Sequence, residues 1–205
     1  MSAPRPHRAS RDELLARLRR AVALDLPYSE RPPTVEGREA SVLALFGENA
    51  AGGYSLLFTR RTETVETHKG QISFPGGARD PEDSDATFTA LRETQEEVGI
   101  DPACIEVVGP LPGLWTPTGF WVMPFVGVLK DPIARTELLV NPLEIAEEFW
   151  ASLAELQAPA TYQKEFKQYG AVRYPIHVYT IGEHRIWGAT GAMVKNLLDR
   201  LEASR

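Results

Sequence analysis

Three glutamates lie close together near residue 95 of this chain. Glu93, Glu96 and Glu97 are spaced i, i+3 and i+4, so on a helix they share one face. Like charges in this arrangement repel one another and do not stabilise an isolated helix. Hard divalent cations such as Mg²⁺ and Mn²⁺ prefer carboxylate and carbonyl oxygens as ligands. The spacing therefore indicates a site for Mg²⁺ or Mn²⁺.

The surrounding residues predict a helix from about 84 to 98. Less polar side chains recur with a period of about 3.6 residues, at Thr87, Leu91, Thr94 and Val98. At about 100° per residue this stripe lies roughly opposite the glutamates, which places Glu97 away from the core. Asp83 or Ser84 is placed to cap the helix start, and Gly99 to end it in the left-handed conformation. The alternative is a surface helix whose acidic face is only solvated.

Together with the glycines upstream, this segment resembles the Nudix box of the Nudix hydrolases, G-x5-E-x7-R-E-U-x-E-E-x-G-U with U aliphatic. The matching residues are Gly77, then Arg92-Glu93-x-x-Glu96-Glu97-x-Gly99-Ile100. The chain has one extra residue before Arg92, and it carries Asp83 and Thr94 where the box has Glu and an aliphatic residue. The resemblance spans roughly residues 38–200. It implies an α/β (α+β) fold, an α/β/α sandwich around a mixed sheet, and metal-dependent hydrolysis.

A block just upstream resembles the coenzyme A (CoA) pyrophosphatase branch of that family. The spacing of its pattern, L-L-T-x-T-[SA]-x3-R-x3-G-x3-F-P-G-G, is kept from Leu57 through Gly70 to Gly77. Identity is lost at several positions, most seriously at Glu66, where the pattern has Arg. The branch implies cleavage of the pyrophosphate of CoA or acyl-CoA into 4′-phosphopantetheine, or its acyl form, and adenosine 3′,5′-bisphosphate.

Within this resemblance the metal ligands can be assigned residue by residue. A pyrophosphate resists attack by water because its oxygens are already negative, and bound Mg²⁺ or Mn²⁺ neutralises that charge. We expect Glu93 and Glu97 to be the leading ligands, Glu96 a further ligand or a water-holding group, and the Gly77 carbonyl an auxiliary ligand. We expect Arg92 to orient a glutamate through a charge-assisted hydrogen bond rather than to touch the substrate.

The general base and the phosphate-binding residues lie outside the box. Glu144 and Glu147 stand where the resemblance places a base, and we take Glu147 as the catalytic candidate; an ordinary exposed acid is the alternative. The expected substrate-binding residues are basic, namely Arg60, Arg61, His68 and Lys69. Arginine suits phosphate because its planar fork binds two oxygens at once, and these residues would replace the arginine that Glu66 displaces. A surface role is the alternative for His68 and Lys69.

Three other functions remain open. The first is a Nudix hydrolase of another nucleoside diphosphate derivative, such as ADP-ribose, NADH or a dinucleoside polyphosphate, which Glu66 keeps open. The second is a non-catalytic nucleotide-binding module, which would not need three glutamates. The third is an mRNA-decapping enzyme, against which the net charge of −6 argues. The expected partner is therefore a small nucleotide, not a nucleic acid.

Composition predicts an ordinary globular enzyme. The chain has 205 residues, enough for one sizeable domain, with 43% hydrophobic and 24% charged residues. The single cysteine, Cys104, cannot form an internal disulfide, which fits a reducing, cytoplasmic location; we expect it to be a small buried residue. No apolar run is long enough to span a membrane.

The N-terminal residues predict a helix from about 11 to 24. Ser10 and Glu13 form a capping box, and the helix has an apolar stripe at Leu14, Leu15, Leu18 and Val22. The stripe needs a partner surface, either the rest of the chain or a second copy in a homodimer. We divide the chain into this helix with a linker, 1–37, and a Nudix hydrolase domain with a C-terminal helix, 38–205.

The remaining elements are predicted from apolar runs, turn residues and periodicity. Strands are expected at 40–46, 54–60, 71–74, 105–109, 121–129, 144–151, 173–181 and 184–187, and further helices at 152–156 and 190–201. Pro75-Gly76-Gly77 is expected to be a turn, and Gly182-Glu183 the turn of a hairpin. Pro124 indicates a bulge or an edge position in its strand.

Overall fold

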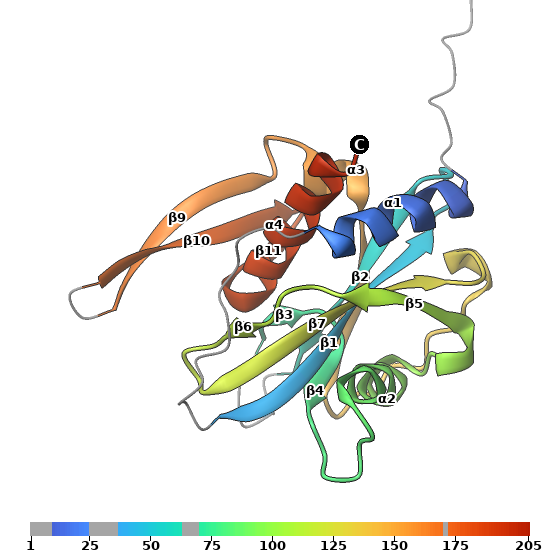
Figure 1. Cartoon of the computed structure of the whole chain (residues 1–205), viewed down its shortest axis with the longest axis horizontal. Coiled ribbons are helices and arrows are strands. Elements are labelled where there is room, and N and C mark those ends of the chain that lie inside the picture. Colours follow the sequence, from blue (N-terminus) through green and yellow to red (C-terminus); the bar gives the residue numbers. More distant parts are fainter. Residues whose placement is uncertain (1–9, 25–36, 63–69, 170–171) are drawn as a thin grey trace, which may run out of the picture.

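The computed structural model describes residues 10–24, 37–62, 70–169 and 172–205. At its centre lies an eight-stranded mixed sheet. Helix α2 (Ala86–Val98) covers one face, and helices α1 (Arg11–Ala23) and α4 (Gly188–Ala203) cover the other (Figure 1). The predicted fold class, a mixed sheet between helices, is therefore confirmed.

The central sheet follows the order β3-β2-β1-β7-β5, with β4 beside β1, β6 beside β7 and β8 beside β2. Its strands are β1 (Arg38–Glu48), β2 (Tyr54–Arg61), β3 (Ile72–Ser73), β4 (Gly76–Ala78), β5 (Ile105–Pro110), β6 (Leu114–Trp115), β7 (Phe120–Leu129) and β8 (Ile145–Ser152). Strand β1 runs parallel to β7 and antiparallel to β2 and β4. Short helix α3 (Leu153–Gln157) and two 3₁₀ turns, η1 (Pro102–Cys104) and η2 (Ile133–Arg135), complete this part.

Each face of the sheet has its own apolar core. Along β1, Leu43 and Leu45 pack toward α2, whereas Ala44 and Phe46 pack toward α1 and α4. Successive strand residues point to opposite faces, so a strand covered on both sides needs apolar residues throughout. This is why the sequence of β1 is a continuous apolar run rather than an alternating one.

Helix α1 packs within its own chain. The capping box of Ser10 and Glu13 is present, and Leu14, Leu15 and Leu18 are buried against β5 and α4. The stripe therefore has the partner surface that it needs. A homodimer and a domain boundary at residue 37 stay predictions.

A second, three-stranded sheet lies beside α4. It contains β9 (Tyr162–Tyr169), β10 (Val172–Ile181) and β11 (His184–Ile186) in the order β11-β10-β9. The predicted turn between β10 and β11 is confirmed, with Gly182 at φ 57°. Strand β9 was not predicted, because its sequence is largely polar. It pairs with β10 in a hairpin that extends away from the central sheet (Figure 1).

Helix α2 differs from its prediction at one end and on one face. Asp85, not Asp83 or Ser84, caps its start, while Gly99 at φ 75° ends it as expected. Its buried residues are Thr89, Ala90, Thr94, Glu97 and Val98. The expectation that Glu97 faces away from the core is wrong, because β4 packs against this side of α2 and its Gly76 N–H donates to Glu97.

Three smaller expectations also need correction. Gly76–Ala78 is strand β4, paired with β1, although its glycines predicted only a turn. Pro124 lies in an interior strand, at the interruption between the ends of the neighbouring β5 and β6, where a missing backbone N–H is tolerated. Cys104 is exposed because it lies on a surface 3₁₀ turn. Among the described residues, no helix is long and apolar enough to cross a membrane.

Candidate active site

Glu97 is a buried carboxylate that accepts few hydrogen bonds. Its side chain is 2% exposed; the Gly76 N–H donates to it at 3.2 Å, and Arg61 Nη1 lies 3.4 Å from its other oxygen. Burial raises the pKa of Glu97 to about 8, and the contacts with Gly76 and Arg61 only partly offset this. Glu97 is therefore a carboxylate whose burial is only partly offset by its hydrogen-bond and ion-pair partners.

Glu93 lies one helical turn earlier, against the Gly77 backbone. A Cβ atom at residue 77 would lie 2.4 Å from the Glu93 carboxylate, so only glycine leaves room for this approach. Burial raises the pKa of Glu93, and the neighbouring Arg92 counteracts the rise. Gly77 and Glu93 are thus held together as the sequence predicted.

Arg92 organises the acidic residues around the start of α2. It binds Asp83 through two nitrogens, with Nε–Oδ1 at 2.9 Å and Nη2–Oδ2 at 3.0 Å. Its Nη1 lies 3.0 Å from Glu93 and 2.9 Å from Glu96. The expected contact of Arg92 with a glutamate is present. It also holds the pKa of Asp83 far below its usual range, which identifies Asp83 as an anchor rather than a helix cap.

Glu96 and Glu144 border Glu93 and Glu97. The Glu96 side chain is 55% exposed, which suits a group that binds water or a cation from the solvent side. Glu144 precedes β8, and its negative charge contributes to the raised pKa of both Glu93 and Glu97. Four carboxylates therefore share this side of the sheet.

Glu147 and Arg60 lie on the opposite face. Arg60 Nε donates to Glu147 at 2.8 Å, and neighbouring Phe58 and Phe149 belong to the core under α1 and α4. His184 of β11 lies 3.0 Å from the second Glu147 oxygen. The structure thus separates Glu147 and Arg60 from Glu93 and Glu97, because strand residues alternate between faces.

Glu147, Glu183 and His184 form a second group of residues whose types could bind a metal ion. Ligand atoms of Glu147, Glu183 and His184 lie within 4.8 Å of one another. However, Arg60 and His184 already bind both oxygens of Glu147 and lower its pKa. This group is therefore a hydrogen-bonded network, including the Arg60–Glu147 ion pair, that joins the second sheet to β2 and β8.

The glutamates of α2, by contrast, fit a divalent cation. Buried Glu97 and partly buried Glu93 have raised pKa values, and the Gly76–Gly77 backbone approaches both of them. Carboxylate and carbonyl oxygens form the donor set that Mg²⁺ and Mn²⁺ prefer. Of the predicted phosphate-binding residues, Arg61 points to this site; His68 and Lys69 lie outside the described residues.

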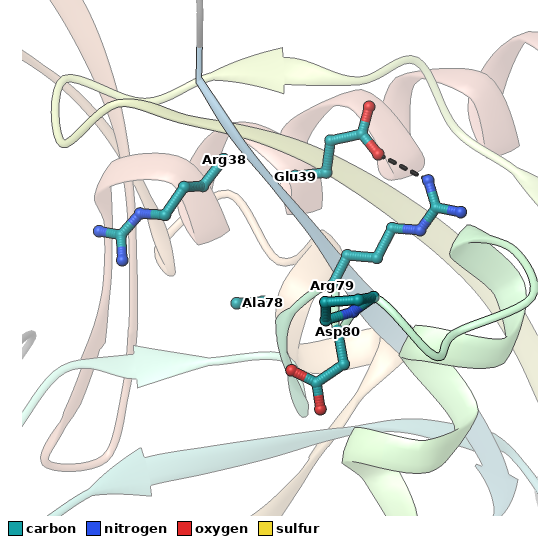
Figure 2. A pocket seen from close by; sticks show the side chains of 6 residues that line it. Arg38, Glu39, Ala78, Arg79 and Asp80 are labelled. Carbon is teal, nitrogen blue, oxygen red and sulfur yellow. Dashed lines mark hydrogen bonds and ion pairs between the residues drawn. The ribbon is translucent and has the colours of Figure 1, made fainter.

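A shallow pocket of about 350 Å³ lies where β1 begins and β4 ends. Arg38 and Ala78 in its lining belong to the face of the sheet opposite α2. The lining of the pocket includes Ala78, which directly follows Gly77, and charged residues that Figure 2 shows around it. Arg79 binds Glu39 at 2.9 Å, and Arg38 lies over the Phe120 ring at 4.3 Å. Arg38 and Arg79 could not be singled out from the sequence, because isolated arginines carry no motif.

Comparison with known proteins shows what this chain is similar to. Residues 36–171 match the family model described as "NUDIX domain". An uncharacterized Nudix hydrolase NudL from Pectobacterium atrosepticum is 37% identical over 174 residues, 85% of this chain and 88% of the relative. The mouse mitochondrial coenzyme A diphosphatase NUDT8 is 37% identical over 149 residues, 72% of this chain and 70% of the relative.

The solved structures agree on the fold. A MutT/nudix family protein from Enterococcus faecalis superposes with a TM-score of 0.54 at 18% identity. The match covers 95% of this chain and 75% of that protein.

Proposed function

This chain belongs to the Nudix hydrolase family, and on that premise we propose that it hydrolyses the pyrophosphate bond of CoA or acyl-CoA. The observation that carries the hydrolytic part is the pair of glutamates, buried Glu97 and partly buried Glu93, packed against Gly76 and Gly77. Their contacts with Arg61 and Arg92 offset the cost of burial only in part, so these side chains are placed to receive a cation.

The residues of α2 have distinct roles in this proposal. Glu93 and Glu97, with the Gly77 carbonyl, would hold Mg²⁺ or Mn²⁺, and Glu96 would bind a further ion or its water. Such an ion would lower the pKa of coordinated water and neutralise charge on the phosphates. Arg92 is a positioning residue, since its ion pairs with Asp83 and Glu93 fix the glutamates before substrate arrives.

Glu144 is the better candidate for the general base. It interacts electrostatically with Glu93 and Glu97, and Asn141 Nδ2 lies 3.5 Å from its carboxylate. Glu147, the candidate from the sequence, is bound by Arg60 and His184 on the other face. A base must lie within reach of the attacking water, and the position of Glu144 supports that role.

CoA as substrate is supported by sequence. The mouse relative is named a CoA diphosphatase, and the chain keeps the spacing of the CoA branch from Leu57 to Gly77. Arg61, beside Glu97, is the described cation best placed to bind a substrate phosphate. Glu66 favours the second candidate, another nucleoside diphosphate derivative, because it would repel the 3′-phosphate of CoA.

A hydrolysis panel tests the proposal. CoA, acyl-CoA, dephospho-CoA, ADP-ribose, NADH and a dinucleoside polyphosphate would be compared with Mg²⁺ and with Mn²⁺. We expect the highest kcat/KM for CoA or acyl-CoA, and a loss of efficiency on removing the 3′-phosphate that is larger at low salt than at high salt. A higher kcat/KM for ADP-ribose would establish the second candidate instead.

A further inference from the structure

Strand β9 has one open edge. It is an outer strand of the second sheet, and β10 is its only strand neighbour among the described residues. The two strands extend away from the central sheet (Figure 1). In an antiparallel pair, alternate residues direct their backbone N–H and C=O groups away from the neighbouring strand. The eight residues of β9 therefore offer a template on which another strand can pair.

The side chains along β9 are largely exposed to solvent. Gln163, Lys164 and Lys167 are exposed, and Phe166 is 50% exposed. The guanidinium of Arg173 on β10 lies 4.2 Å from the centroid of the Phe166 ring, on the same face of the hairpin. The middle of this edge thus carries an aromatic side chain between charged ones, and not only the lysines that commonly block pairing at a sheet edge.

A second copy of this chain can pair with this edge in few registers. In a twofold antiparallel pair, directly opposed residues share one face, and the axis passes between a residue and its own copy. An axis at Lys164, Glu165 or Lys167 would place two like charges directly opposite each other, which destabilises the pair. An axis at Phe166 instead places two aromatic rings opposite each other, and such cross-strand pairs stabilise antiparallel strands.

The axis at Phe166 also pairs opposite charges. Glu165 then lies opposite Lys167 of the second copy, and Lys167 lies opposite Glu165 of the second copy. Both side chains lie on the face of β9 that Phe166 does not use. Within its own chain Glu165 accepts from Arg185 at 2.8 Å but is still 40% exposed. It therefore has room for a second cation on the open side of the strand.

We propose that two copies of this chain pair edge to edge through β9, in antiparallel register about Phe166, so that their second sheets form one continuous sheet. The apolar stripe of α1, which from the sequence is the candidate dimer surface, already packs within its own chain. The glutamates of α2 take no part in the interface, so this inference does not depend on the substrate of the enzyme.

Sedimentation velocity across a range of protein concentrations tests the interface. The parent should change from monomer to dimer as concentration rises. Glu165→Lys and Lys167→Glu should each raise the dissociation constant by roughly tenfold or more, because two attractive cross-strand pairs become two repulsive ones. An equimolar mixture of the two variants should dimerise again, since each lysine of one variant then faces a glutamate of the other.

Disulfide trapping tests the register. Because Cys104 is exposed, the variants would be made in a Cys104→Ser background. Phe166→Cys should give a disulfide-linked dimer under mild oxidation, because directly opposed Cβ atoms lie about 5 Å apart, close to the roughly 4 Å of a disulfide. Lys164→Cys is the matched control on the same face. Its copies would lie about 13 Å apart, at 3.3 Å per residue, and should be trapped far more slowly.

Three outcomes would overturn the inference. A parent that stays monomeric at every concentration would show that the lysines of β9 keep the edge unpaired. A dimer that persists in both charge variants would place the interface elsewhere on the chain. Equal trapping at residues 164 and 166 would contradict the register. Hydrolysis per chain should stay close to that of the parent in all these variants, so none of these outcomes bears on the proposed function.

Discussion

Two groups of carboxylates lie on opposite faces of the same sheet and differ in their supply of positive charge. On the α2 face, burial raises the pKa of Glu97 to about 8 and also raises that of Glu93. On the other face, His184 and Arg60 lower the pKa of Glu147. A carboxylate whose two oxygens are already bound, as in Glu147, is structural, whereas one whose partners only partly offset its burial is a candidate ligand for an external cation.

Two adjacent arginines show the same division. Arg60 pairs with Glu147 and Arg61 with Glu97, because consecutive strand residues point to opposite faces. From the sequence, both arginines are predicted to bind phosphate. The structure places Arg61 at the carboxylate site and pairs Arg60 with Glu147, whose other oxygen binds His184 of the second sheet.

The largest difference between the two groups should appear in turnover. We expect Glu97→Gln to lower kcat by roughly a hundredfold to a thousandfold, the scale of losing a key charge-stabilising group. Glu147→Gln is the matched control on the other face and should change kcat by less than about threefold. Steady-state hydrolysis at saturating Mg²⁺ measures both. Near-normal turnover of Glu97→Gln would refute the metal assignment, and a larger loss in Glu96→Gln would exchange the roles of the two glutamates.

The next largest effect on turnover is expected from replacing the general base. Glu144→Gln should lower kcat by about a hundredfold, a usual contribution of general base catalysis, and should change the low-pH limb of the kcat profile. Divalent-cation binding, followed by the rise in Tm with Mn²⁺, should be retained in this variant. If Glu147→Gln shows the larger loss and the altered pH profile, the original sequence prediction is right and Glu144 is not the base.

Replacing Arg61 and replacing Arg60 should differ less in their effect on kcat/KM than the glutamate variants do. Arg61→Ala should lower kcat/KM by roughly tenfold, about the value of one charge-assisted hydrogen bond, with its main effect on KM. Arg60→Ala should leave kcat/KM close to that of the parent and lower the free energy of unfolding instead, because Glu147 loses a partner. Kinetics and urea denaturation of both variants test this. Equal kinetic losses would mean that both arginines reach the substrate.

The smallest effect concerns the pH dependence of stability in the metal-free protein. The pKa of Glu97 is about 8 in the folded state against an ordinary 4.5, so the folded state retains a proton that the unfolded state releases. Between about pH 4.5 and 8 this group should therefore make unfolding easier as pH rises. The folded pKa of Glu147 lies below 4.5, so its contribution is present above that pH and is lost as pH falls through the folded pKa.

Urea denaturation in EDTA across about pH 3 to 9 measures both slopes. Glu97→Gln should flatten the decline toward alkaline pH, and Glu147→Gln should flatten the decline toward acid. Mg²⁺ should restore stability at high pH in the parent but not in Glu97→Gln, because ligand binding to the folded state alone stabilises it. An unchanged alkaline slope in Glu97→Gln would show that Glu97 is not the group responsible.

Some elements could be predicted because their information is local. The capping box of α1, the hairpin at Gly182, the end of α2 at Gly99 and the apolar stripe of α4 depend on residues a few positions apart. Strand β9 and strand β4 could not be predicted in this way. Polar β9 is a strand because β10 pairs with it, and the glycines of β4 are a strand because β1 pairs with them.

For the site, the sequence by itself determined which carboxylates stand together on α2, because the spacing of Glu93 and Glu97 and the helical period suffice for that. It also placed Gly77 beside them, through the resemblance of the motif. Only the tertiary structure decided that Glu97 is buried, that Asp83 anchors Arg92, and that Glu144 rather than Glu147 shares their side of the sheet. Burial and facing depend on which strands pair and on which face each helix covers, and these are contacts between residues far apart in the chain.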